Sequence, residues 1–462
     1  MDHGWVMTAG DTSGLGRKNA TWLLSSASGF WLAMALVALP TCARTGGRSP
    51  AWEDRIQLAS GTAERGPWRQ NESDFRWVDD PAVDIGPNGE AYVAWVDQSR
   101  KEVFFQRYGQ DGRQRLPAPA DISRSPDVFS WLPRLVVARS DPNQVFILWQ
   151  EIVFSGGSHG GEIFFARSTD GSSFSSPANL SNSEAGDGKG RLSATTWDNG
   201  SLDLAEGPRG ELHAAWTEYE GRLLFRRSTD RGQSFSEALH VGGGPGAPAR
   251  GPSVGVGAAG AVHLAWSVGE DPSADIHVAS SNDHGQSFGN ARPVCESDGH
   301  SDAPKIAVDR HGTVHLVYVE KGARGSHQGH IRYSRMKIGT DRFEPPRALP
   351  GSSGDNLQRA HAPNLALDGR GRVYVLWEHH RGAEESPTGL AFSYSADGGE
   401  RFASPVEVPG IAGPALGSNG SQQGALTKKL AVDAGGLIAI VNSTFREHRA
   451  SHVWLLRGRL PQ

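Results

Sequence analysis

Short apolar stretches recur along the chain in pairs, and a turn that contains glycine separates the two members of each pair. The second member alternates apolar with small residues and usually ends in an aromatic side chain. An alternation with a period of two predicts β-strands, and glycine between them predicts tight turns. The pairs occupy residues 81–95, 133–149, 202–216, 252–266, 304–318, 363–377 and 429–442.

The pairs are regularly spaced. Equivalent positions in their first strands are 82, 134, 203, 253, 305, 364 and 429, so successive pairs lie 50 to 69 residues apart. This spacing leaves room for four short strands in each repeat, which is typical of β-propeller blades. We therefore predict an all-β, seven-bladed β-propeller. Six blades is the alternative, if one pair is an additional hairpin.

The last repeat lacks an obvious fourth strand. Residues 55–58 are similar to the strand that ends other repeats, such as 405–408, and we expect them to complete the final blade. This closure would remove an exposed sheet edge and join the two ends of the fold. The prediction is a single propeller domain over residues 55–462.

A second motif, Ser-x-Asp-x-Gly-x-x-Phe, follows several of the pairs. An aspartate in such a turn can accept backbone N–H bonds, the glycine allows a positive φ, and the phenylalanine anchors the turn in the core. A role repeated in successive blades favours structure over catalysis. The aspartates of the three complete copies and of one shorter copy, to which we assign this structural role, are Asp230, Asp283, Asp397 and Asp170, while 108–112 and 334–343 are degraded copies.

The N-terminus resembles an export signal. Arg17 and Lys18 precede the apolar run Phe30–Leu39, which is too short to span a bilayer but suits a signal peptide. The following Pro-Thr-Cys42 resembles the lipobox of bacterial lipoproteins, which implies a lipid on Cys42. We predict a signal segment at 1–42, a tether at 43–54 and a lipoprotein of the cell envelope or surface. The alternative is cleavage near Ala43 and a soluble exported protein.

Composition limits the kinds of partner and cofactor that the protein is expected to bind. The net charge is −5, acids and bases are interspersed, and no basic tract carries interleaved aromatic residues, so we exclude nucleic acid as a partner. Cys295 is the only cysteine besides Cys42, so a lipidated chain has no disulfide. The histidines show no metal-ligand spacing. We expect a monomer with no cofactor, and calcium is not indicated.

The candidate site is the face opposite the Asp-containing turns, where loops of all blades converge. Four acids stand two residues after a closing aromatic, so strand alternation points them to one side. They are expected to form a ring that binds cations, amines or sugar hydroxyls, or to supply an acid and a base for glycoside cleavage; solvated strand ends are the alternative. The acids are Asp97, Glu151, Glu218 and Glu320, and the ligand-binding candidates are Glu151, Asp302, Glu320, His361 and Glu378.

From about residue 78 to 457 the chain resembles the sialidase-like Asp-box propellers. The resemblance implies an arginine triad that clamps a substrate carboxylate and a nucleophilic tyrosine. Asp79-Asp80-Pro81 replaces the first arginine motif, while 95–100 looks like the aromatic-acid-arginine segment that follows it. Tyr219 is the one tyrosine in a suitable loop, and its placement differs from that of the family. The catalytic candidates are Arg76, Asp80, Asp97, Arg250, Arg359, Tyr219 and Glu218.

These patterns predict an exported, lipid-anchored propeller that binds a glycan or a protein on its loop face. The alternative is a glycoside hydrolase of the exo-sialidase type with a divergent site. A scaffold without a small-molecule site is the third hypothesis, because a fold alone does not specify an activity.

Overall fold

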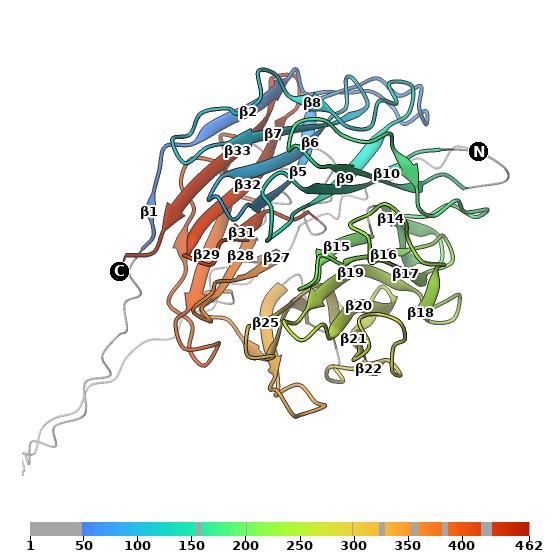
Figure 1. The fold of residues 1–462 in the computed structure, drawn as a ribbon, viewed down its shortest axis with the longest axis vertical. Helices are drawn as coiled ribbons and strands as arrows, with labels where there is room; N and C mark the ends of the chain where they lie inside the picture. Colours follow the sequence, from blue (N-terminus) through green and yellow to red (C-terminus); the bar gives the residue numbers. More distant parts are fainter. Residues whose placement is uncertain are drawn as a thin grey trace, which may run out of the picture. The chain divides into compact units, whose positions relative to one another are not determined.

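Strands account for all regular structure in the part of the chain that the computed structural model describes (Figure 1). The described residues are 49–153, 159–199, 201–297, 299–322, 329–352, 359–380, 387–416 and 427–461. The chain divides into the units Met1–Arg44 and Thr45–Gln462. The described residues begin at 49, so the predicted signal segment with Cys42 lies outside them. Within the described ranges, no helix is long and apolar enough to cross a membrane.

Antiparallel meanders of four strands form the repeating element. In the first, β5 (Val78–Ile85), β6 (Ala91–Asp97), β7 (Glu102–Tyr108) and β8 (Ala120–Asp121) pair in chain order. The predicted strand pairs correspond to the first two strands of these meanders. Three further sheets have the same order: β9 (Ser130–Val137), β10 (Val145–Glu151), β11 (Glu162–Ser168) and β12 (Ala178–Asn179); β15 (Leu202–Glu206), β16 (Leu212–Thr217), β17 (Arg222–Ser228) and β18 (Leu239–Gly243); and β27 (Arg359–Leu367), β28 (Val373–His380), β29 (Gly389–Ser395) and β30 (Val406–Glu407).

One sheet has eight strands. It contains β19 (Ala249–Val256), β20 (Val262–Glu270), β21 (Ser273–Ser281) and β22 (Arg292–Pro293), followed by β23 (His300–Val308), β24 (Val314–Lys321), β25 (Gly329–Met336) and β26 (Arg347–Ala348). A single parallel pair, Ala274 with His300, joins the two halves. The described residues thus form five sheets of four or five strands and this larger one, besides two short hairpins. The sheet count therefore differs from the seven, or alternatively six, separate blades that we predicted.

Both ends of the described chain meet in the last sheet. It holds β31 (Leu430–Val432), β32 (Leu437–Arg446) and β33 (Ala450–Arg459), and β33 also pairs with β1 (Ala51–Trp52) and β2 (Ile56–Gly61). Figure 1 shows the blue β2 beside the red β33. Of the segment expected at 55–58, residues 56–58 thus lie in β2, whose pairing with β33 runs from Ile56 to Gly61, while Arg55 precedes the strand.

The first strands of successive meanders are neighbours in space. β5 lies beside β9, and the order continues through β15, β19, β23 and β27 to β31, which also lies beside β5. This closed arrangement is that of an all-β propeller. Because sheets cover each other face to face, the second strands are buried on both faces. The aromatic residues that close them are at most 3% exposed: Trp95, Trp149, Trp216, Trp266, Tyr318 and Trp377.

A proline bulge recurs in the first strands. The residue before proline has a positive φ in five of them, and the pairing register shifts at the same place. A bulge bends the strand and redirects the neighbouring side chains. The residues two positions before these prolines are therefore equivalent, and they include three of the candidates. The five are Asp79, Trp131, Arg250, Asp302 and His361.

The Asp-containing motifs hold the turns between third and fourth strands. Asp230 Oδ1 accepts N–H bonds from Gln233 at 3.0 Å and Ser234 at 2.9 Å, and the Ser228 hydroxyl donates to it at 2.7 Å. Asp170, Asp283 and Asp397 accept equivalent bonds. The phenylalanine of each motif packs edge to face on an aromatic ring from the preceding meander, in the pairs Phe174–Phe105, Phe235–Phe165, Phe288–Phe225 and Phe402–Tyr333.

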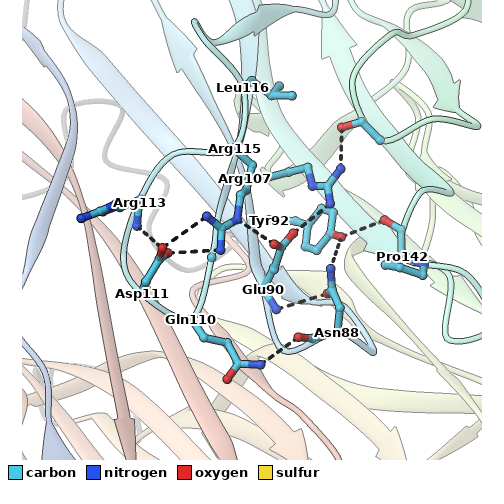
Figure 2. Close-up of polar contacts among 12 residues, drawn as sticks. Asn88, Glu90, Tyr92, Arg107, Gln110, Asp111, Arg113, Arg115, Leu116 and Pro142 are labelled. Carbon is cyan, nitrogen blue, oxygen red and sulfur yellow. Dashed lines mark hydrogen bonds and ion pairs between the residues drawn. The ribbon is translucent and has the colours of Figure 1, made fainter.

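In the first meander, ion pairs replace the missing serine–aspartate interaction (Figure 2). Glu90 accepts hydrogen bonds from Arg107 and Arg115, each at 2.8 Å. Arg115 also lies 3.2 Å from Asp111, and Gln110 donates to the Asn88 carbonyl at 2.9 Å. The degraded motif at 108–112 therefore has a charged network in its place.

Replacing Asp230 with alanine is expected to lower the free energy of unfolding by about 1–2 kcal/mol, because two backbone N–H groups lose their acceptor. Asp230→Asn keeps one acceptor oxygen and should cost less. Urea unfolding of the three proteins measures both effects. An alanine variant as stable as the wild type would contradict the structural role.

Candidate functional site

A short hairpin lies between the second and third meanders. It consists of β13 (Lys189–Ser193) and β14 (Thr196–Asn199), and Arg191 is paired with Trp197 in its register. It lies in the longest of the sequence intervals, the 69 residues between positions 134 and 203. β13 also lies against β19 and β20 of the fourth meander. The hairpin thus adds side chains to the loop side of the fold.

Three aromatic rings from separate segments form a stack, which we call the aromatic stack (His159, Tyr219 and Trp197). The Tyr219 ring centroid lies 4.2 Å from that of His159 and 4.2 Å from that of Trp197, with interplanar angles of 11° and 21°. His159 is exposed, and the other two are half-buried. Rigid aromatic rings at the surface give a large contact area with little loss of conformational entropy.

Two cations of the hairpin lie against this stack. Lys189 Nζ is 5.7 Å from the Tyr219 ring centroid, and it donates a hydrogen bond to the His159 carbonyl at 2.8 Å. The Arg191 guanidinium carbon lies 5.4 Å from the Trp197 ring centroid. Arg191 also forms an ion pair with Glu270, in which Nε and Oε1 are 2.7 Å apart. Burial lowers the pKa of Lys189. Among the described residues no carboxylate pairs with Lys189, whose charge is therefore available to an anionic group.

Asp187 anchors the segment that leads into the hairpin. Its backbone N–H donates to the Gly161 carbonyl at 2.6 Å, and Gln150 donates to its carbonyl at 2.9 Å. A side chain at Gly161 would meet that same carbonyl oxygen at 2.2 Å, and Gly161 has a φ of +97°, so this position requires glycine. The Trp216 indole donates to the Asp187 carboxyl at 2.7 Å. Burial raises the pKa of Asp187 to about 8, which favours the neutral carboxyl near pH 7.

An ion cluster lies beside the hairpin at the start of β19 and β23. Arg250, which is 2% exposed, donates to Asp302 at 3.1 Å and to His300 Nε2 at 2.8 Å, and Ser267 donates to Asp302 at 2.9 Å. Because arginine only donates, His300 Nε2 is the acceptor and its Nδ1 carries the proton, 3.1 Å from Asp271. Burial opposes the charge of Asp302, but the Arg250 guanidinium holds the pKa of this carboxyl well below its usual value.

The four acids expected to form a ring each have partners in their own meander. Glu151, which is buried, accepts from the Trp149 indole at 2.8 Å, so alternation does place it on the side of that aromatic ring. Its pKa and those of Asp97 and Glu218 are raised by burial. Asp97 accepts from the Ser99 N–H at 3.0 Å, Glu218 pairs with Arg222 at 3.2 Å and Glu320 with Arg332 at 2.6 Å. These partners engage the carboxylates that the sequence left open for a ligand.

The remaining candidates lie in separate surroundings. Arg76 is exposed on β4 (Phe75–Arg76) and forms an ion pair with Asp74, two residues earlier in the chain, at 2.8 Å. Asp80 is fully buried in the first bulge, and Arg359 begins β27 opposite His380.

Near the last two meanders, Glu378 pairs with Lys429, and both are buried. The ring centroids of His361 and His380 are 5.2 Å apart, and burial lowers the pKa of His361 to about 4. Among the described residues, no three His, Cys, Asp or Glu side chains could hold a metal ion together.

No known family model matches the chain, and no curated protein matches its sequence. Solved structures do match. An ulvan lyase of polysaccharide lyase family PL25, bound to a saccharide containing GlcA, has a TM-score of 0.53 and 13% identity over 86% of this chain and 95% of its own. A protein of unknown function from Dyadobacter fermentans has a TM-score of 0.50 and 13% identity over 88% of this chain and 99% of its own.

A second polysaccharide lyase has a TM-score of 0.50 and 10% identity, and the match covers 89% of this chain and 100% of that one. At such identities the likeness concerns the fold alone. The sequence has the fold of an all-β propeller that is also used by enzymes acting on glycans.

Proposed function

We propose that this protein binds an acidic glycan at the aromatic stack and at Lys189. The observation that carries the proposal is the Lys189 ammonium, which lies beside the Tyr219 ring and has no carboxylate partner in the described part of the chain. Stacked rings offer flat faces to sugar rings, and an ammonium beside them attracts a uronate carboxylate. The polysaccharide lyases that share the fold act on glycans, one of them bound to a GlcA-containing saccharide, which supports this ligand class.

Binding of polygalacturonate and alginate, with dextran as the neutral polymer, tests the proposal. Trp197→Ala is expected to weaken binding of a uronate polymer about tenfold, which corresponds to about 1.4 kcal/mol. Lys189→Met should remove the preference over dextran and the salt dependence. Trp68→Ala is the matched control, because Trp68 is 54% exposed but lies outside the stack. Equal losses in the Trp68 and Trp197 variants, or no binding of either uronate polymer, would refute the proposal.

A second candidate is cleavage of the bound glycan. The observation that favours it is that Tyr219, His159 and Lys189, three groups able to transfer protons, meet at one place. Release of new reducing ends from the same polymers, lost in Tyr219→Phe while binding persists, would establish an enzyme. A sialoside that is cleaved would instead favour the exo-sialidase hypothesis.

We also propose that the ring has seven blades and that the protein is a sialidase-like Asp-box propeller exported as a lipoprotein. Counting the eight-stranded sheet as two blades joined by one residue pair supports the number seven. The bonds of Asp170, Asp230, Asp283 and Asp397 support the Asp-box assignment. Metabolic labelling with palmitate, compared between the wild type and Cys42→Ser, tests the anchor.

A further inference from the structure

A cavity of about 410 Å³ opens between the segment that precedes β23 and the later strands of the fifth meander. Its walls come from the segment before β23, from the end of β24 and from β25. The lining residues that matter for the argument are Cys295, Glu296, Tyr318, Glu320 and Arg332. Its volume is within the range of small-molecule sites, which begins at roughly 300 Å³.

The polar groups of the cavity suit a ligand rich in hydroxyl groups. Glu320 and Arg332 are paired at 2.6 Å and are 21% and 29% exposed, so both reach the solvent.

The charges of the cavity select against anions. Of the residues that the structure describes, two carboxylates, Glu296 and Glu320, line it together with one guanidinium, and Glu320 already neutralises that guanidinium. A uronate would meet a negative surface here, in contrast to Lys189 at the aromatic stack. Neutral sugar hydroxyls can donate to the carboxylates and accept from Arg332.

We propose that this cavity is a second carbohydrate site that takes one neutral sugar ring. The inference rests on the proposed function for its ligand class, but it concerns a different site. A glycan that contains both acidic and neutral sugars would then have a place for each kind. Cys295 Sγ, which lies 3.5 Å from the Tyr318 hydroxyl in the wall, provides a native probe of occupancy.

Saturation-transfer NMR with glucose, galactose, mannose, rhamnose and glucuronate tests the proposal. The measurement uses the Trp197→Ala protein, in which the aromatic stack is disrupted. A signal then reports on the cavity alone, and its presence or absence does not depend on the site of the proposed function. At least one neutral sugar, and not glucuronate, is expected to give a signal that Glu320→Gln removes. Glu344→Gln, which removes a carboxylate paired with Arg335 outside the cavity, should leave that signal unchanged.

The same sugar should slow alkylation of Cys295 by iodoacetamide, followed on the Cys295 peptide by mass spectrometry. A sugar at about twice its dissociation constant slows the reaction about threefold by mass action. The proposal is overturned if no neutral sugar gives a signal at concentrations up to about 0.1 M, which detects millimolar binding. A signal that persists equally in both glutamate variants, or unchanged alkylation of Cys295, would also overturn it.

Discussion

Replacing Arg250 with leucine is expected to lower the free energy of unfolding by about 3–5 kcal/mol. The guanidinium is 2% exposed and donates to Asp302, to His300 and to the Gly269 carbonyl. Its loss therefore leaves the Asp302 carboxylate without its counter-charge, where the first strands of two neighbouring meanders begin. Denaturant unfolding measures the effect. The double variant Arg250→Leu/Asp302→Leu should recover part of the loss, because it removes the stranded charge as well.

Arg292→Ala provides the matched comparison. Arg292 also pairs with an aspartate, Asp341 at 2.9 Å, but both side chains are more than half exposed. Such a pair contributes less than about 1 kcal/mol. If Arg250→Leu were equally mild and abolished glycan binding instead, Arg250 would be a ligand-binding residue, as the sialidase resemblance implies.

The strand repeats could be predicted because their signals are local. Alternation, a glycine turn and a closing aromatic residue all lie within about fifteen residues, and the structure places those residues in adjacent strands. The sheet count is different, because the single pair Ala274 with His300 merges two sheets. No sequence pattern signals one additional parallel bridge.

The candidate site could be predicted only in part, because its residues are assembled by loops. Alternation correctly puts Glu151 beside Trp149, but it does not show that the indole and Ser125 would engage the carboxylate. The aromatic stack brings together residues 159, 197 and 219, which share no motif. The long interval before position 203 was the available signal, since extra length between regular repeats indicates an insertion.

The prolines that mark the bulge are visible in the sequence, but the alternation of apolar residues does not identify them as a sign of a site. Three site candidates stand two positions before such a proline, namely Arg250, Asp302 and His361. The bulge gives them equivalent places near the start of their strands. Periodicity alone treats such residues as ordinary strand positions. Their chemistry follows from the neighbouring meander, as the pairing of Arg250 with Asp302 shows.

Asp187→Asn is expected to stabilise the protein at alkaline pH and to have little effect near pH 4. Burial, with smaller contributions from Glu162 and Glu218, raises the pKa of Asp187 from 3.8 to about 8. The folded state therefore holds a proton that the unfolded state releases between these values, so wild-type stability falls as pH rises through this range and levels off above it. At about 1.4 kcal/mol per pH unit, the total is on the order of 6 kcal/mol.

Asparagine keeps an acceptor for the Trp216 indole and has no proton to lose, so the variant should lack this part of the pH dependence. Urea unfolding of both proteins at several pH values between about 4 and about 9 measures the difference. Parallel pH profiles would show that Asp187 is ionised in the folded protein. The backbone of Asp187 holds the segment that leads to Lys189 and Trp197, so charging its side chain should loosen the aromatic stack. Wild-type glycan binding is therefore expected to weaken above about pH 8, while Asp187→Asn retains it until Lys189 loses its proton.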